Sequence, residues 1–199
     1  MMKSRVTNYI FFLFFGIAIT GLNVQGGNFA VDKAHSQINF NVKHMVLSKV
    51  QGNFSEFEID LNFNEAEVTK SSVTAVLQAG SISTANEDRD NHLKGADFFA
   101  AEQFPTLEFA STEVTKAEDG YILHGHLTMH GITKKVQIPF EITGIIDDPW
   151  GNRRAGFEGH LTVDRQDYGI SWSKTMDTGG LIVSNKVNIE LNLEAIMNK

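Results

Sequence analysis

The sequence predicts an all-β fold, either a barrel or a sandwich of about eight or nine strands, with one short helix. Two observations lead to this prediction. Apolar and polar residues alternate along most of the chain, which is typical of half-buried strands joined by short connections. One polar segment, residues 84–99, interrupts the alternation and has the features of a helix. If the strands close into a barrel of eight, its interior can either pack solid or hold one small ligand.

The first half of the chain contains three segments with clear alternation, at residues 38–44, 57–63 and 73–77. In each of them the inward-facing residues are mainly apolar, so one face of the strand is expected to be buried. The apolar residues occupy even-numbered positions up to Phe54 and odd-numbered positions from Phe57 onward. This change predicts a bulge or a kink between the two strands.

The second half continues the pattern after the helix-like segment. His130 and Gly131 begin a hairpin turn, and residues 147–152 form a second cluster of turn residues. Pro139 has outward parity, and because proline cannot donate to the ladder, an edge or a bulge is expected there. Strands are predicted over residues 107–109, 121–129, 136–142, 157–163 and 181–193.

The helix-like segment has local features that support a helix. Asn86 or Asp88 can cap its beginning, and the acidic residues of the first turn suit the helix dipole. Gly95 weakens it near its end. Three apolar side chains are spaced to share one face: Leu93, Ala96 and Phe99. Such a helix either plugs one end of a barrel or forms a lid over the mouth of a cavity.

The amino-terminal segment has the layout of a secretory signal peptide. An apolar run at residues 9–19 follows two basic residues and precedes a small-residue cleavage site at residues 24–26. A membrane anchor is the alternative, but the run is shorter than the roughly 20 residues that a span needs. We therefore expect a signal peptide over residues 1–26, one domain over residues 27–199, and an exported protein.

Composition narrows the classes of partner. The chain has no cysteine, which excludes disulfides and a lipoprotein anchor. Its formal net charge is −7, with 24 acidic residues against 17 basic ones. An acidic protein of this kind is not expected to bind nucleic acid or an anionic membrane surface.

Four segments of the chain resemble one known family, the YceI-like, polyisoprenoid-binding proteins. The central one is residues 86–99, from Asn86-Glu87-Asp88-Arg89 to Asp97-Phe98-Phe99, followed by Phe104-Pro105 and Phe109. The others are residues 31–44, 125–134 and 147–158, in the same order as in the family. Residues 164–180 match the family pattern least.

The resemblance implies an extended, eight-stranded, antiparallel, lipocalin-like β-barrel with a short helix near one end. It implies an elongated apolar tunnel for a long-chain amphiphile, such as a polyisoprenoid, an isoprenoid quinone or a fatty amide. The bound lipid would be the ligand, with no other cofactor, and the role would be its transport, storage or protection. The resemblance also implies a periplasmic protein, often a homodimer, with no stable membrane insertion once the signal peptide is removed.

A tunnel for a hydrocarbon chain needs apolar walls, with its orientation set by polar groups at the mouth. Each predicted wall residue can equally be ordinary core. The wall candidates are Phe40, Val42, Phe54, Leu77, Phe98, Phe99, Leu107, Phe109, Leu127, Met129, Ile138, Phe140 and Trp172. The head-group candidates are Arg89, His92, Arg154 and His44.

The head-group candidates have structural alternatives. Arginine can hold a phosphate in a bidentate manner, but Arg89 can instead pair with Asp88 or Asp90, and Arg154 with Glu158. His44 has inward parity and can be a core histidine.

Other chemistries are less well supported. His124 and His126 share a strand face, but no acidic residue of the same parity lies near them on that strand, so no metal site is expected. Asp90, His92 and Ser81 or Ser83 could form a hydrolytic set acting on a lipid-like substrate. There is, however, no Gly-x-Ser-x-Gly elbow, and we expect no enzyme. A second alternative is a stress-related interaction protein with a filled barrel and no ligand.

Overall fold

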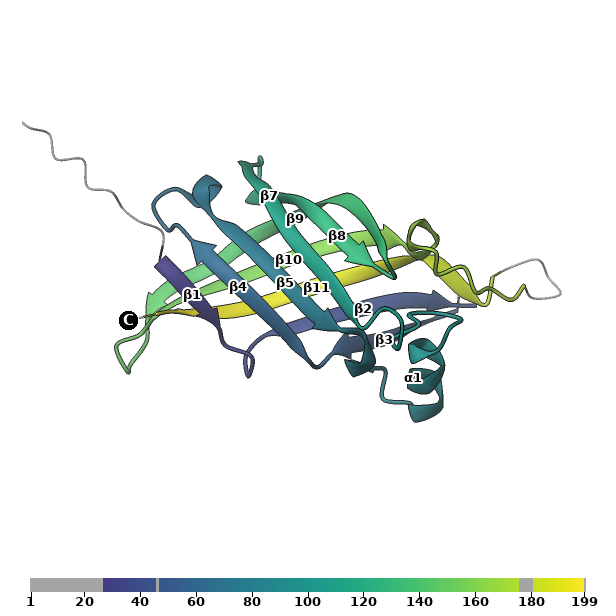
Figure 1. The fold of residues 1–199 in the computed structure, drawn as a ribbon. Helices are drawn as coiled ribbons and strands as arrows, with labels where there is room; N and C mark the ends of the chain where they lie inside the picture. Colours follow the sequence, from purple (N-terminus) through teal and green to yellow (C-terminus); the bar gives the residue numbers. More distant parts are fainter. Residues whose placement is uncertain (1–26, 46, 176–180, 199) are drawn as a thin grey trace, which may run out of the picture.

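A computed structural model describes residues 27–45, 47–175 and 181–198 of the chain (Figure 1). The predicted signal peptide lies outside the described residues and stays a prediction. Within the described part, no helix is both long enough and apolar enough to cross a membrane.

Strands make up most of the fold. They are β1 (Gly27–Val31), β2 (Gln37–His44), β3 (Ser48–Phe54), β4 (Phe57–Phe63), β5 (Ser72–Gln78), β6 (Ile82–Ser83), β7 (Thr106–Lys116), β8 (Tyr121–Met129), β9 (Ile132–Asp147), β10 (Arg153–Asp164) and β11 (Val183–Met197). The helices are α1 (Glu87–Lys94) and three short 3₁₀ turns, η1 (Val68–Lys70), η2 (Ala79–Ser81) and η3 (Arg165–Tyr168).

The strands form a closed, eight-stranded, antiparallel barrel, as predicted. The ring runs β1-β4-β5-β7-β8-β9-β10-β11 and closes through the pairing of β11 with β1. Farther along β11, β2 takes the place of β1, so β1 and β2 act as one strand interrupted at residues 32–36. In the same way β3 and β4 follow each other around a corner at Ser55 and Glu56. This corner is the kink that the parity change predicted.

The wall is not equally continuous everywhere. The ladder between β9 and β10 stops at the pair of Phe140 and Gly159, although β9 begins eight residues earlier, at Ile132. Pro139 lies just beyond the last pair of that ladder and still pairs with Ile122 of β8. A proline therefore stands where one side of the strand has lost its partner, as its missing N–H requires.

The segment after β10 packs against the beginning of β9. Tyr168 of η3 is buried, with only 2% of its surface exposed. Its carbonyl oxygen lies 3.1 Å from Nδ1 of His130, in the turn that leads into β9. Gly169 takes the left-handed conformation and comes close to the same histidine.

Two clusters of buried apolar residues lie inside the barrel. One is near α1 and includes Phe54 and Phe98. The other is near β1, where Phe63 packs edge-on against Phe29 and Phe157 with ring centroids 5.4 and 5.0 Å away. In Figure 1, α1 and β1 lie toward opposite ends of the elongated barrel.

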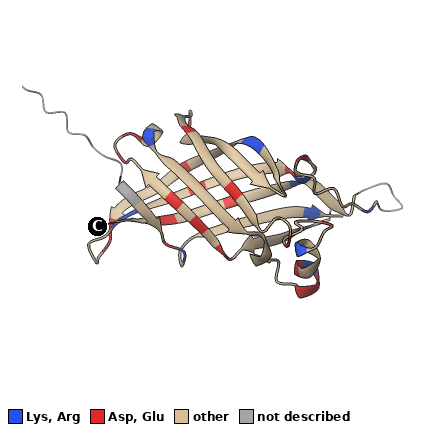
Figure 2. Ribbon diagram, viewed as in Figure 1, with Lys and Arg blue, Asp and Glu red and all other residues tan. Residues whose placement is uncertain are grey.

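Helix α1 forms where the sequence predicts it and is shorter than expected. The Asn86 side chain caps it by accepting a hydrogen bond of 2.9 Å from the Arg89 N–H. The helix ends at Lys94 because Gly95 takes an extended conformation. The prediction that Ala96 and Phe99 share a helix face with Leu93 is therefore wrong, because both residues lie in the turns that follow the helix. Charged residues of both signs stand on α1 (Figure 2).

We predict that Gly125→Ala lowers the free energy of unfolding by about 2 kcal/mol, because an overpacked site must shift its neighbours. A Cβ on Gly125 would lie 2.6 Å from the carbonyl oxygen of Ala110 and would overlap the ring of Phe109. Urea unfolding measures the change.

Gly144→Ala is the matched control, since nothing lies within 4 Å of a Cβ built there. Its expected change is within about 0.5 kcal/mol. Equal effects at the two glycines would contradict the close approach of the Phe109 ring to β8.

Candidate functional site

Three apolar chambers follow one another along the inside of the barrel. The central chamber has a volume of about 140 Å³. The helix-end chamber, of about 100 Å³, lies next to the segment after α1, and the β1-end chamber, of about 80 Å³, lies next to β4 and Phe63. Neighbouring chambers share wall residues, so they lie next to one another along the inside of the barrel. Central and helix-end chambers share Phe40, Phe54, Leu107, Met129 and Ile189, and central and β1-end chambers share Ile59, Val73, Leu123, Ile138, Leu191 and Leu193.

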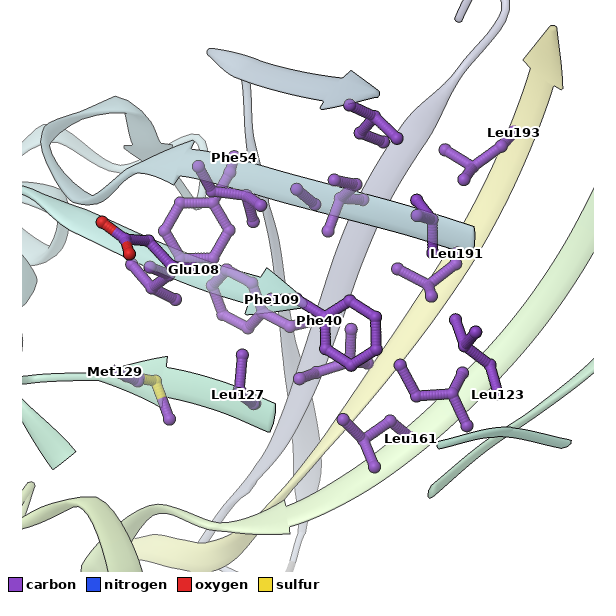
Figure 3. Close-up of a pocket in the computed structure, with 18 of the residues that line it drawn as sticks. Phe40, Phe54, Glu108, Phe109, Leu123, Leu127, Met129, Leu161, Leu191 and Leu193 are labelled. Carbon is purple, nitrogen blue, oxygen red and sulfur yellow. The ribbon is translucent and has the colours of Figure 1, made fainter. Parts of the chain in front are cut away.

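The walls of the central chamber are almost entirely apolar. Figure 3 shows the rings of Phe40 and Phe109 and the side chains of Leu123 and Leu127 gathered around it. The carboxylate of Glu108 points away from them in the same view. A cavity with these walls offers almost no partner for a polar ligand and favours a hydrocarbon chain.

Glycines make room for two of the aromatic rings. The Phe109 ring lies against Gly125 of β8, and the Phe40 ring lies against Gly52 of β3. At either glycine a Cβ would overlap the ring, so the small residue lets the ring come close to the backbone of the wall. This placement leaves open space along the axis of the barrel.

The structure brings together all but one of the residues predicted to line a tunnel. The central chamber is lined by Phe40, Phe54, Leu77, Leu107, Phe109, Leu127, Met129 and Ile138, the helix-end chamber also by Val42, Phe98 and Phe99, and the β1-end chamber also by Phe140. Trp172 lies outside these walls. It packs against Phe98 and His92, with ring centroids 5.2 and 5.3 Å away.

The two ends of the cavity are covered differently. At the helix end, Leu93, Phe98 and Phe99 reach the chamber from the last turn of α1 and the turns after it, and the Phe99 ring packs edge-on against Phe54 at 5.8 Å. At the β1 end the edge-on rings around Phe63 pack together in the second buried cluster.

Three of the head-group candidates lie toward the helix end, and none of them is among the wall residues of the three chambers. Arg89 is exposed and donates from Nε to Thr84 Oγ1 at 2.7 Å and from Nη2 to the Thr84 carbonyl oxygen at 3.0 Å. His92 is paired with Asp97 at 2.8 Å. His44 is half-buried at the end of β2.

Arg154 lies at the opposite end of the barrel, at the beginning of β10. Its Nε donates to Asp148 at 2.6 Å, and its Nη1 donates to Asp32 at 3.0 Å and to Glu194. Pairing with Glu158, the alternative from the sequence, does not occur. Residues four apart on a strand are about 13 Å apart.

Two of the carboxylates around Arg154, those of Asp32 and Asp148, have lowered pKa values. Partial burial would raise the pKa of Asp148, but hydrogen bonds from Arg154, Asn152 and Trp150 outweigh it and hold the pKa well below its usual range. For Asp32, hydrogen bonds from His35 and then Arg154 lower the pKa against the effect of burial. This cluster fastens the turn after β1 to the beginning of β10 and the end of β11.

The side chains considered for catalysis and metal binding have separate partners. Asp90 accepts hydrogen bonds from the backbone N–H and the hydroxyl of Thr84, whereas His92 pairs with Asp97. Ser81 donates to the Gln78 carbonyl oxygen at 2.7 Å.

Two histidines in and next to β8 also have separate partners. His124 lies 2.9 Å from the hydroxyl of Thr115 on β7. His130 contacts the Tyr168 carbonyl oxygen and the ring of Phe104. Neither the hydrolytic set nor the histidine cluster is assembled within the described residues.

One polar wall residue was not predicted from the sequence. Arg165, the first residue of η3, lines the helix-end chamber and is only 4% exposed. It continues the odd parity of Phe157, Leu161 and Val163, which point inward along β10. This odd-numbered position after Val163 is the feature of the sequence that could have indicated an inward-facing side chain at Arg165.

A family model, the YceI-like domain, matches residues 29–195. The chain belongs to the YceI-like family. The match covers the whole barrel, from β1 to nearly the end of β11.

Other YceI-like and related proteins extend the likeness. A UPF0312 protein from Yersinia pestis (strain Pestoides F) is 34% identical over 185 residues, which cover 92% of this chain and 93% of the relative. The crystal structure of BcnA from Burkholderia cenocepacia matches with a TM-score of 0.73 at 23% identity, over 82% of this chain and 98% of BcnA. A polyisoprenoid binding domain from Saccharophagus degradans matches with a TM-score of 0.59 at 13% identity, over 86% and 99%. The two structural likenesses concern the fold.

We predict that Arg154→Gln destabilises this YceI-like barrel at neutral pH and that the difference from the unchanged protein narrows below about pH 4. A carboxylate whose folded pKa is lowered contributes stability above its unfolded pKa of about 3.9, and this contribution is lost as the pH falls through the folded pKa. Asp32 and Asp148 lose part of that contribution when Arg154 is removed. Urea unfolding between pH 7 and pH 2.5 measures it.

Lys33→Gln is the control, because the pair of Lys33 and Glu58 is exposed and such pairs contribute little. A constant difference between R154Q and the unchanged protein across this pH range would contradict the assigned role of the cluster.

Proposed function

We propose that this protein binds a long-chain amphiphilic lipid inside the barrel, for transport, storage or protection of that lipid. The candidates are a polyisoprenoid, an isoprenoid quinone or a fatty amide. The observation that carries the proposal is the run of three adjoining apolar chambers inside the barrel. The described similarity to a polyisoprenoid binding domain agrees with it in fold.

The shape of the barrel suits a chain better than a compact ligand. Strands β9 and β11 contain 16 and 15 residues, so each extends about 50 Å at about 3.3 Å per residue. Each CH₂ group buried in such a cavity contributes about 0.8 kcal/mol before the loss of chain freedom is subtracted. A long hydrocarbon is therefore the class of ligand that gains most from this interior.

The alternatives explain less of the structure. A filled barrel without ligand would not need the open space that remains between Phe40, Phe109 and the leucines around them. A lipid hydrolase would need assembled catalytic groups, and the candidate residues near α1 are held apart by other partners. We therefore propose a binding protein without catalytic activity.

The place of action also belongs to the proposal. The basic start, apolar run and cleavage site of residues 1–26 support export to the periplasm. A lipid carrier in an aqueous compartment must shield its cargo from water, and a closed barrel does so. A homodimer remains an expectation from the family resemblance.

We predict that Ala75→Phe weakens the binding of a neutral fluorescent hydrocarbon, such as diphenylhexatriene, by roughly tenfold or more. Ala75 lines the central chamber, so the added ring would occupy the space of several CH₂ groups. Fluorescence titration gives the affinity, and urea unfolding checks that the barrel is intact.

Ala110→Phe is the matched control. Ala110 pairs with Thr74, the neighbour of Ala75, and is exposed, so the same ring there points away from the cavity. Equal affinities for A75F, A110F and the unchanged protein would show that the hydrocarbon binds elsewhere.

A further inference from the structure

Lysines gather at one end of this acidic barrel. β2 ends and β11 begins at the end that lies away from β1 (Figure 1). There Lys43 of β2 stands directly opposite Lys49 of β3, and both side chains are exposed. Lys186, also exposed, lies in the bulge of β11 that precedes the pair of Val187 and Val42. Three neighbouring strands therefore each bring one lysine to this end of the barrel.

This arrangement of lysines is unfavourable in the protein alone, because like charges directly opposite one another on a sheet repel. Nearby carboxylates offset the charges only in part. Asp164 of β10 stands opposite Lys186, whereas Glu190 of β11 accepts a hydrogen bond of 3.0 Å from Asn41. An anionic surface outside the protein would turn the same three positive charges into a source of attraction.

Large apolar side chains are exposed at the same end. Leu47, in the turn between β2 and β3, is 89% exposed, and Leu181, shortly before β11, is exposed as well. The turn is held beside the beginning of β11, because the Met45 N–H donates to the Ile182 carbonyl oxygen at 2.9 Å. Leu47 precedes Lys49 by two residues, or about 7 Å of strand. An apolar tip ahead of a row of cations suits a bilayer surface, where leucine enters the acyl boundary and lysine meets the head groups.

The opposite end of the barrel also exposes large apolar side chains, but its charges differ. Trp150, in the turn between β9 and β10, is 77% exposed, and Ile146, at the end of β9, is 59% exposed. Their neighbour Asp147 is acidic, and the arginines that follow, Arg153 and Arg154, are each paired with carboxylates. Apolar exposure alone does not distinguish the two ends, whereas the lysines do.

We propose that the lysine-bearing end of the barrel docks on the surface of a bilayer that contains anionic lipids. The docking surface, the lysine-rich rim, consists of Lys43, Leu47, Lys49, Leu181 and Lys186. The formal net charge of −7 opposes contact between such a bilayer and the rest of the molecule, so docking is confined to the rim and weakens as salt is added.

A bilayer fits the rim better than a protein partner does. A stable protein interface buries about 800 Å² on each side, and lysine is depleted from such interfaces. Two exposed leucines among three lysines do not form a patch of that kind. Val42 and Val183, on the same strands as the rim, line the helix-end chamber, so docking brings this chamber to the lipid surface. The inference goes beyond the proposed function, because the rim can dock whether or not the barrel holds a lipid.

Binding to vesicles, measured by co-sedimentation, tests the proposal. The chain is taken after export, and its intact mass verifies the removal of residues 1–26, whose apolar run would itself bind vesicles. Vesicles of phosphatidylcholine are compared with vesicles of phosphatidylcholine and phosphatidylglycerol in equal amounts. We expect binding to the anionic vesicles to be about tenfold tighter or more, and to be lost between about 0.01 M and 1 M salt.

Lys43→Gln combined with Lys49→Gln should weaken binding to the anionic vesicles by roughly 25-fold, since each lysine near such a surface contributes about fivefold. The double substitution relieves the repulsion between two opposed lysines, so the barrel is expected to keep its stability. Leu47→Ser should weaken binding by about tenfold, because one leucine no longer enters the bilayer.

Each change has a matched control. Lys134→Gln combined with Lys135→Gln removes two exposed lysines from β9, which β10 and β11 separate from β2 in the sheet. Ile146→Ser removes an exposed aliphatic side chain from the opposite end. Both controls should bind anionic vesicles within about threefold of the unchanged protein, because the attraction falls off within a Debye length of the surface.

Three results would overturn the proposal. Equal losses in K43Q/K49Q and K134Q/K135Q would show that net charge acts without a defined rim. Loss of binding in I146S, with L47S unaffected, would place the contact at the opposite end. No binding of the unchanged protein to anionic vesicles at low salt would leave the rim to a partner other than a bilayer. A75F should dock like the unchanged protein, so failure of docking and failure of lipid binding in the barrel are distinguishable.

Discussion

The pairing along β11 is the interaction on which the rest of the structure depends. This strand pairs with β10 on one side and with both β2 and β1 on the other, and the last of these pairings closes the ring. Closure satisfies the backbone along both sides of the strands and leaves the sheet with an inside and an outside. The alternation of apolar and polar residues then has only one consequence, an interior lined by hydrocarbon. The break between β1 and β2 is tolerated because Asp32 and Ser36 bond to the Glu194 backbone and Arg154 ties the same residues together.

An apolar interior becomes a binding site only if the side chains do not fill it. Here glycines at two positions let Phe40 and Phe109 lie against the wall, and neighbouring chambers share wall residues. The two ends then differ in chemistry. The β1 end holds the edge-on rings around Phe63, and the Arg154 cluster lies at the same end of the barrel. The helix end has a cover of turns and one buried guanidinium.

Much of this architecture could be predicted from the sequence because apolar residues recur at every second position of the strands. Side chains point into the barrel with the same period of two. The strands, the wall residues and the cap at Asn86 follow from local patterns. The pairing of Arg154 could not be predicted, because its partners come from three segments that meet only when the ring closes. Arg165 was missed for a related reason: an arginine after a strand is usually exposed, and the carbonyl groups of Ile170 and Ser184 surround it only in the folded chain. Helix α1 ends earlier than its apolar spacing suggested because Gly95 has an extended conformation.

Native mass spectrometry of the purified chain tests the central claim most directly. The chain is isolated without detergent, its intact mass is recorded, and an organic extract of the same sample is analysed. The account predicts a bound mass that matches one long-chain amphiphile for each chain and that reappears in the extract as a lipid. A chain of bare mass, which also fails to take up any long-chain lipid added afterwards, would contradict the claim that this barrel is built around a hydrocarbon ligand.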